Sequence, residues 1–244
     1  MPPPRFSHGS KVRLTDRDLD RFPGETLFDR VARATCHAGC LPRKELYEAW
    51  EMARRVRRRF RGGRVVDLGA GHGLLAHLLL LLDDTSSSAL VVDTVLPPSC
   101  ARLHNALVEA WPRLAGRMSF VTASLSEVSL EADDLVVSSH ACGGLTDAVL
   151  AGAVAARARV AVLPCCHDPN VSDTGDLIGW IDPALAIDIV RVTRLRREGY
   201  HVWTQTIPDA ITPKNRLLLA APASSPPEML NVGTGGASRS RRPR

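Results

Sequence analysis

The segment VVDLGAGHG at residues 65–73 decides the fold. It begins with a short β-branched run, and glycines follow at positions 69, 71 and 73. This pattern is typical of a strand that ends in a tight loop, where a ligand can approach the backbone closely. The segment contains no Gly-Lys-Ser/Thr, which excludes a P-loop, and it lacks the G-x-G-x-x-G spacing that an NAD fold prefers.

The next predicted strand, ALVVD at residues 89–93, ends in an acid. In dinucleotide-binding proteins, an acid about 20 residues beyond the first strand holds the ribose hydroxyls of the ligand. Asp93 is within range of this position, and a second acid, Asp67, stands just before the glycines. The two acids and the glycines therefore indicate a binding site at the ends of these strands.

Outward from the glycine loop, strands and helices alternate along the chain. This is the βαβ signature of a mostly parallel sheet with helices on both faces. The last two strands are joined by a short connection, which favours an antiparallel pair. We therefore predict an α/β, Rossmann-like, seven-stranded sheet with an antiparallel last strand. The predicted strands are 64–68, 89–93, 118–124, 134–140, 159–166, 200–208 and 215–222, with helices at 73–82, 97–111, 145–158 and 182–198.

The N-terminal third of the sequence is predicted to be helical. TDRD at residues 15–18 has the form of a capping box, and a second helix is expected from about Glu25 to Thr35. In residues 42–60 the apolar positions recur every three or four residues, which predicts one buried helical stripe. We expect a helical extension at 1–62, an α/β domain at 63–222 and a disordered basic tail at 223–244.

The composition of the 244-residue chain indicates one globular domain of the larger kind. Hydrophobic residues make up 45% of it, enough for a full layered core. The six cysteines are unevenly spaced, which predicts reduced thiols in a cytoplasmic protein. The longest apolar run, residues 74–82, is too short to cross a bilayer, and the first residues lack a signal-peptide pattern, so no membrane partner is expected.

Two arginine-rich segments account for the positive net charge of +5. Residues 54–64 hold seven arginines and residues 238–244 hold four, and neither segment contains an acid. Such segments are typical of contacts to a phosphate backbone, although a solvated helix face followed by a disordered tail is the alternative. The predicted contacts are the C-terminal tail and Arg54, Arg55, Arg57, Arg58, Arg59 and Arg61.

Two further segments concentrate histidine and cysteine at strand ends. HACGGLTD at residues 140–147 follows the fourth predicted strand, and PCCHD at residues 164–168 follows the fifth. In a doubly wound sheet, ligands bind outside the carboxyl ends of the strands. If these two strands are neighbours, the side chains of both segments approach one another at a substrate site.

These motifs resemble a known family. D-L-G-A-G-H-G at residues 67–73, with Asp93 and a terminal antiparallel hairpin, resembles the class I S-adenosylmethionine-dependent methyltransferases over residues 60–220. The H-x-C-G-x-x-T-D and C-C-H segments resemble one group of them, which includes the eukaryotic tRNA 2′-O-methyltransferases of the acceptor stem. LPRKELYEAWE (41–51) and TIPDAITPKNRLLL (206–219) look like a bacterial branch of this group.

The resemblance implies in-line methyl transfer from S-adenosylmethionine to RNA by a methyltransferase domain at residues 63–222. The glycine loop would line the methionine part of the cofactor, the acid after the second strand would hold the ribose, and a serine after the third would bind the adenine amino group. The residues so implied are Asp67, Gly69, Gly71, Gly73, Asp93 and Ser124. Two alternatives stay open: a small-molecule or protein methyltransferase, and a cofactor-binding scaffold without catalysis.

The two His/Cys segments are compatible with three kinds of chemistry. In the first, His140 or His167 accepts a proton, and Asp147 either orients a histidine or caps the following helix. In the second, a thiolate such as Cys165 attacks a pyrimidine ring to activate C5. The third is a zinc site, which we do not predict, because adjacent cysteines rarely bind one ion and neither segment has C-x₂-C spacing. The predicted catalytic residues are His140, Cys142, Asp147, Cys165 and His167.

Overall fold

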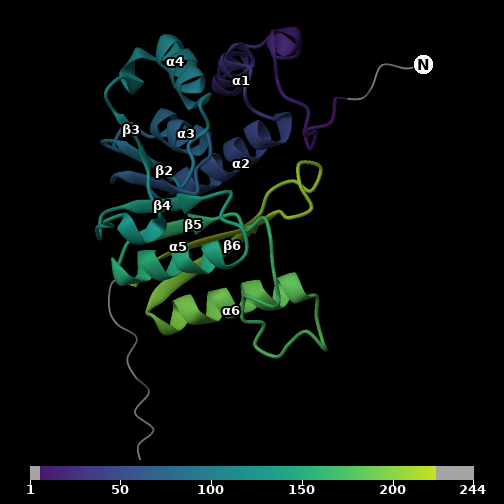
Figure 1. The fold of residues 1–244 in the computed structure, drawn as a ribbon, viewed down its shortest axis with the longest axis vertical. Coiled ribbons are helices and arrows are strands. Elements are labelled where there is room, and N and C mark those ends of the chain that lie inside the picture. Colours follow the sequence, from purple (N-terminus) through teal and green to yellow (C-terminus); the bar gives the residue numbers. More distant parts are fainter. Residues whose placement is uncertain (1–5, 224–244) are drawn as a thin grey trace, which may run out of the picture.

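The computed structural model describes residues 6–223 of the chain (Figure 1). Its strands are β1 (Val65–Leu68), β2 (Ala89–Asp93), β3 (Met118–Thr122), β4 (Leu135–Ser138), β5 (Arg159–Val162), β6 (Tyr200–Thr206) and β7 (Arg216–Pro222). The α-helices are α1 (Leu27–Ala38), α2 (Arg43–Arg59), α3 (Leu74–Leu82), α4 (Cys100–Ala110), α5 (Gly144–Ala155) and α6 (Pro183–Arg197). Short 3-10 helices are η1 (Asp16–Arg21), η2 (Pro112–Leu114) and η3 (Leu125–Glu127).

The seven strands form one sheet in the order β3-β2-β1-β4-β5-β7-β6. The first five strands pair in parallel, whereas β7 runs antiparallel to both β5 and β6. The predicted α/β sheet with an antiparallel end is therefore confirmed. The chain proceeds from β1 to β2 and β3 and then crosses back to β4, so β1 and β4 flank a topological switch point, where ligands bind in such sheets.

Helices cover both faces of the sheet (Figure 1). α2 and α3 pack on one face with α1 and α4 outside them, and α5 and α6 cover the other face. Successive strand residues enter opposite cores, as Val65 belongs to the hydrophobic cluster on the α2–α3 side and Val66 to the cluster on the α5–α6 side. Because both faces are covered, the parallel strands are almost continuously apolar.

The N-terminal helices share the core of the sheet. Leu46, Ala53 and Val56 on the predicted stripe of α2 are completely buried, in the same hydrophobic cluster as residues of β1. α1 begins after Thr26, whose hydroxyl accepts a hydrogen bond from the Asp29 N–H at 3.1 Å. The capping-box segment at residues 15–18 starts the 3-10 helix η1 rather than an α-helix.

Arg57 corrects the prediction that this arginine is available to a phosphate backbone. Its side chain is 3% exposed and lies 3.1 Å from a carboxyl oxygen of Asp83. Its guanidinium also donates hydrogen bonds to the Leu79 carbonyl at 3.0 Å and to the Ser86 hydroxyl at 2.8 Å. Arg57 follows Val56 on the buried side of α2, and it fastens the end of this helix to the end of α3.

The other predicted arginines lie at the same end of α2. Arg58, Arg59 and Arg61 are exposed, whereas Arg54 and Arg55 form ion pairs with Glu51 of the preceding turn. Since α2 ends shortly before β1 begins, these arginines lie at the amino edge of the sheet. A ligand on the glycine loop would be bound at the opposite, carboxyl edge.

Two sequence predictions concern regions at the limit of the structure. The tail predicted to be disordered and to contact a phosphate backbone, 223–244, lies outside the described residues except for Ala223, whose N–H donates to the Gly199 carbonyl at 2.8 Å. Between residues 6 and 223, no helix is both long and apolar enough to cross a membrane.

The buried His77 on α3 makes stability depend on pH. Its Nδ1 atom lies 2.7 Å from the Gly73 carbonyl and must donate, so its Nε2 atom accepts from His104, 3.1 Å away. Burial lowers the pKa of His77 from 6.5 to about 4. The unfolded chain therefore takes up this proton first, and stability is lost as the pH falls from about 6.5 to about 4, by up to ~3 kcal/mol.

Urea unfolding across this pH range measures the effect. A His77→Leu variant, which has no proton to take up at this position, should show a shallower pH dependence than the natural protein. Equal slopes for the two proteins would contradict the assignment.

Candidate functional site

The glycine loop after β1 has a left-handed backbone at three positions. The φ angles are 64° at Gly69, 54° at Gly71 and 73° at Gly73, where residues other than glycine are disfavoured. At Gly73 an added β-carbon would also lie 2.9 Å from a methyl group of Val91 on β2. The three glycines therefore form one tight turn that joins the carboxyl end of β1 to α3.

Asp93 ties the end of β2 to this loop. Its Oδ2 atom accepts a hydrogen bond from the Gly71 N–H at 2.9 Å. Its Oδ1 atom has only longer contacts, to the Val95 N–H at 3.3 Å and the Thr94 hydroxyl at 3.4 Å. The half-buried carboxylate thus supports the loop with one oxygen and keeps the other weakly engaged, which suits a residue that binds ligand hydroxyls.

Asp67 lies beside the glycine loop without a partner. It is 1% exposed, and neither carboxyl oxygen makes a hydrogen bond among the described residues. Burial raises the pKa of Asp67 to about 8, and the Ala76 N–H opposes this rise without reaching hydrogen-bond geometry. An unpartnered buried carboxyl is costly. A cationic ligand on the loop would reduce that cost by favouring the ionised form.

Ser124 follows β3 and caps the short helix η3. Its hydroxyl and its N–H both donate to the Glu127 carboxylate, each at 2.7 Å. The hydroxyl proton is therefore used, but the oxygen keeps lone pairs that can accept from an amino group. Its predicted contact with adenine stays a prediction.

His140 lies at the carboxyl end of β4, within electrostatic range of both α2 and the glycine loop. Burial raises the pKa of Glu45 in the first turn of α2, and His140 opposes this rise. Burial also lowers the pKa of His72 in the glycine loop, and Arg13, His140 and Arg102 add to that effect. These groups bring charge from three parts of the chain to one edge of the sheet.

Glu45, His72, Arg13 and Arg102 carry no sequence signal that marks them as site residues. An acid in the first turn of a helix is ordinarily explained by the helix dipole. Only the packing of α2 against the sheet shows that Glu45 faces the end of β4 rather than solvent.

Cys142, Cys165 and Cys166 meet where the loops after β4 and β5 run side by side. The Sγ atoms of Cys142 and Cys165 are 2.8 Å apart, and the Lys214 Nζ atom lies 3.8 Å from the Cys166 Sγ atom. The predicted approach of the two segments is confirmed for these thiols, because β4 and β5 are neighbouring parallel strands. Burial raises the pKa of Cys165, whereas the hydrogen bond from Cys142 lowers that of Cys166.

Asp147 and His167 belong to an ion-pair network with α6. Asp147 accepts two hydrogen bonds of 2.9 Å from Arg191, and the His167 Nε2 atom lies 2.9 Å from Asp188. Arg216 donates to the other oxygen of Asp188 at 2.6 Å. This corrects the prediction that Asp147 orients a histidine: the Arg191 side chain is 1% exposed and needs a carboxylate partner, and Asp188 orients His167 instead.

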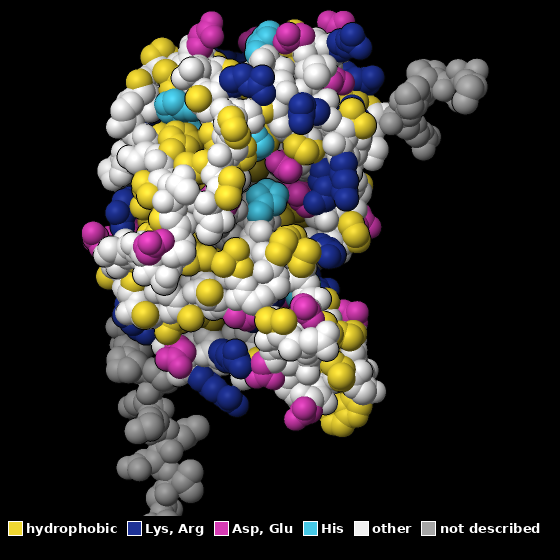
Figure 2. Space-filling model, in the orientation of Figure 1, with side chains coloured by type: hydrophobic (Ala, Val, Ile, Leu, Met, Phe, Trp, Pro, Cys, Tyr) yellow, Lys and Arg dark blue, Asp and Glu magenta, His cyan; other side chains and the backbone are white. Residues whose placement is uncertain are grey.

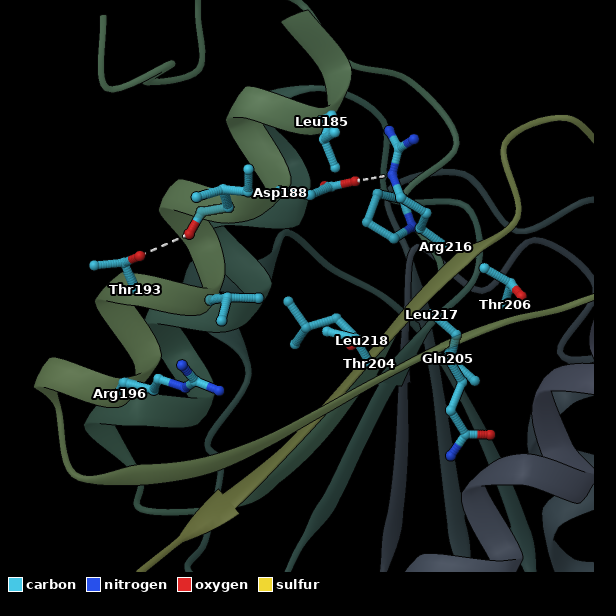
Figure 3. A pocket seen from close by; sticks show the side chains of 13 residues that line it. Leu185, Asp188, Thr193, Arg196, Thr204, Gln205, Thr206, Arg216, Leu217 and Leu218 are labelled. Atoms are coloured by element: carbon cyan, nitrogen blue, oxygen red, sulfur yellow. Dashed lines mark hydrogen bonds and ion pairs between the residues drawn. The ribbon is translucent and has the colours of Figure 1, made fainter. Parts of the chain in front are cut away.

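A groove of about 620 Å³ lies between α6 and the β6–β7 hairpin (Figure 3). The ion pair between Asp188 and Arg216 crosses one end of it, and Leu185, Leu217 and Leu218 contribute to its apolar lining. The groove contains neither the glycine loop nor His140, so it is separate from the candidate site.

A family model described as a methyltransferase domain matches residues 44–171, which include the glycine loop and both His/Cys segments. The chain belongs to this family. No curated protein sequence matches this methyltransferase.

Solved structures of other methyltransferases share the fold. An O-methyltransferase family protein from Burkholderia thailandensis matches with a TM-score of 0.50 and 18% identity, over 88% of this chain and 65% of that one. The mitomycin 7-O-methyltransferase MmcR matches with a TM-score of 0.48 and 16% identity, over 86% and 64%. For the N-methyltransferase NodS from Bradyrhizobium japonicum the values are 0.45 and 13%, over 74% and 97%. The methyltransferase studied here spans less than two thirds of the first two proteins.

Proposed function

We propose that this methyltransferase uses S-adenosylmethionine to methylate RNA, at an oxygen or nitrogen atom whose proton passes to His140. The observation that carries the proposal is the unpartnered buried Asp67 next to a glycine loop braced by Asp93. Such a loop suits a ligand that has both ribose hydroxyls and positive charge. Family membership supports methyl transfer as the reaction.

The residues of the loop fit S-adenosylmethionine. The ligand is cationic at its sulfonium and ammonium groups, which complements the Asp67 carboxyl. The weakly engaged oxygen of Asp93 would hold the ribose hydroxyls, the turn at Gly69, Gly71 and Gly73 would admit the methionine part, and Ser124 would contact the adenine. When bound, the cofactor supplies an electrophilic methyl group.

His140 would receive the proton of the acceptor atom. It lies at the end of β4, beside the switch point, and Glu45 provides a nearby negative charge that favours a protonated imidazole. A positioned general base of this kind contributes about 100- to 10,000-fold to a rate. Glu45 takes the orienting role that the sequence assigned to Asp147.

Covalent catalysis by a thiolate is the second candidate chemistry. Burial raises the pKa of Cys165, which makes the thiol of this residue a poor nucleophile. Cys166 is better suited, since a hydrogen bond from Cys142 and the charge of Lys214 both lower its pKa. Methylation at C5 of a pyrimidine would require one of these thiolates.

An RNA acceptor is supported by the resemblance of the His/Cys segments and by basic side chains at the carboxyl edge. Arg13 and Arg102 act on His72, and Lys214 contacts Cys166. The exposed arginines at the end of α2 lie about 20 Å from Glu45 along the helix, so only an extended RNA would reach both. On the face shown in Figure 2, basic side chains are interspersed with acidic and apolar ones rather than joined into one basic surface.

The proposed acceptor is tested with purified protein, S-adenosylmethionine labelled with tritium on the methyl group, and an extract from a strain that lacks the gene. Label that is released by ribonuclease and not by protease is the expected result. Label released by protease, or label in small molecules, would overturn the RNA acceptor. Clear cofactor binding by calorimetry without any incorporation would favour a scaffold.

Replacing Asp93 with asparagine should weaken S-adenosylmethionine binding by about 10- to 100-fold, because a charge-assisted contact is worth about 1.5–3 kcal/mol. Calorimetry measures the affinity directly. Asp209→Asn is a matched control, since Asp209 is exposed in the β6–β7 connection. Equal affinities for the two variants would remove Asp93 from the cofactor site.

A further inference from the structure

Three thiols converge at the carboxyl edge of the sheet. The Sγ atoms of Cys142, Cys165 and Cys166 all lie within 4.8 Å of one another. The Cys142–Cys165 separation is 2.8 Å and the Cys165–Cys166 separation is 3.9 Å. Cys142 is exposed and the other two are half-buried, so the cluster is accessible to solvent.

The backbone holds the two loops together at this point. The Gly143 N–H donates a hydrogen bond to the Cys166 carbonyl at 3.2 Å, and the Leu163 N–H donates to the Ser138 carbonyl at 3.0 Å. Gly143 has φ 57° and ψ −131°, a conformation that glycine adopts far more readily than other residues. This turn directs the preceding residue, Cys142, toward the β5 loop.

We propose that Cys142, Cys165 and Cys166 bind one zinc ion through three thiolates and leave its fourth position open to water or another small ligand. Zinc forms bonds of about 2.3 Å to thiolate sulfur, and sites with three protein ligands and an open position are typical of reactive zinc. Thiolates select soft metals of this kind over magnesium or calcium. The site does not depend on the identity of the methyl acceptor.

The geometry meets the objection that adjacent cysteines rarely share an ion. In a tetrahedral site, bonds of about 2.3 Å place neighbouring sulfurs roughly 3.8 Å apart. Cys165 and Cys166 already have a 3.9 Å separation, although they are consecutive in the chain. Cys142 and Cys165 would move apart by about 1 Å, which the exposed loop around Cys142 permits.

The charges around the cluster favour one divalent ion. Three thiolates would place three negative charges within a few ångströms, and the cation found beside them is Lys214, 3.8 Å from Cys166. Zinc neutralises two of these charges and Lys214 offsets the third. Formation of the three zinc–sulfur bonds releases the thiol protons to solvent, so zinc binding weakens as the pH falls.

Metal analysis of the untagged full-length protein, purified under reducing conditions, tests the site. About one zinc per chain is expected in the natural protein, and the metal-free protein should bind cobalt with the visible absorption of a tetrahedral thiolate complex. Cys142→Ala should weaken cobalt binding by at least tenfold, and its circular dichroism should be unchanged because Cys142 is exposed. Cys36→Ala, a buried cysteine in α1, is the matched control and should keep the metal.

Three results would overturn the proposal. One is a folded protein with all six thiols reduced and no bound zinc or cobalt. Another is equal metal binding by the natural protein and Cys142→Ala. The last is a Cys142–Cys165 disulfide in the purified protein with no metal binding after reduction. None of these depends on methyl transfer, and calorimetry of the same samples with S-adenosylmethionine reports the cofactor site separately.

Discussion

Replacing His140 with alanine is expected to lower the turnover number of the methyltransferase by about 100- to 10,000-fold, the usual contribution of a general base. The affinity for S-adenosylmethionine should stay the same, because the glycine loop and Asp93 are held by their own backbone contacts. Single-turnover methylation of the RNA fraction identified by nuclease release measures the chemical step, and calorimetry measures the affinity.

The matched control is His201→Ala. His201 is exposed on the edge strand β6 and should be dispensable for methyl transfer. Loss of activity in both variants to the same degree would point to a general effect of histidine replacement. Full activity of His140→Ala would exclude this residue as the proton acceptor and favour the thiolate chemistry of Cys166.

Replacing Arg57 with alanine is expected to lower the free energy of unfolding by about 3 kcal/mol, because it leaves a buried partner of the ion pair without its counter-charge. The Asp83 carboxylate retains hydrogen bonds from the Gly62 N–H at 2.8 Å and the Thr85 hydroxyl at 2.7 Å, which limits the loss. Urea unfolding followed by circular dichroism gives the difference.

The neighbouring Arg58 supplies the control for Arg57. It has the same chemistry, sits one residue later on α2 and is exposed. Arg58→Ala should change the free energy of unfolding by less than about 0.5 kcal/mol. Similar urea midpoints for Arg57→Ala and Arg58→Ala would contradict the buried role of Arg57.

The fold was predictable because local patterns determine it. The valines of β1, the glycines at 69, 71 and 73 and the alternation of strands and helices each act over a few residues. Arg57 shows where that reasoning ends. Its sequence neighbours are arginines that do face solvent, and only the packing of α2 on α3 reveals that the Asp83 carboxylate lies within its reach.

The site was predictable in part. Strand ends identify the loops of the site, so the meeting of Cys142 with Cys165 follows from the pairing of β4 with β5. Glu45 and Lys214 come from regions far away in sequence, and no local pattern places them at the same edge. Asp147 was assigned to a histidine because Arg191, its partner across α5 and α6, is 44 residues away.

The strand order also has a consequence for synthesis on the ribosome. β7 lies between β5 and β6, so the sheet stays incomplete until residue 222 has been translated. Until then β5 presents a free edge with Val160 and Val162, which are fully buried in the finished protein. Apolar edges of this kind recruit strands from other molecules. Translation that stalls before residue 216 would therefore leave a nascent chain that needs a chaperone to escape aggregation.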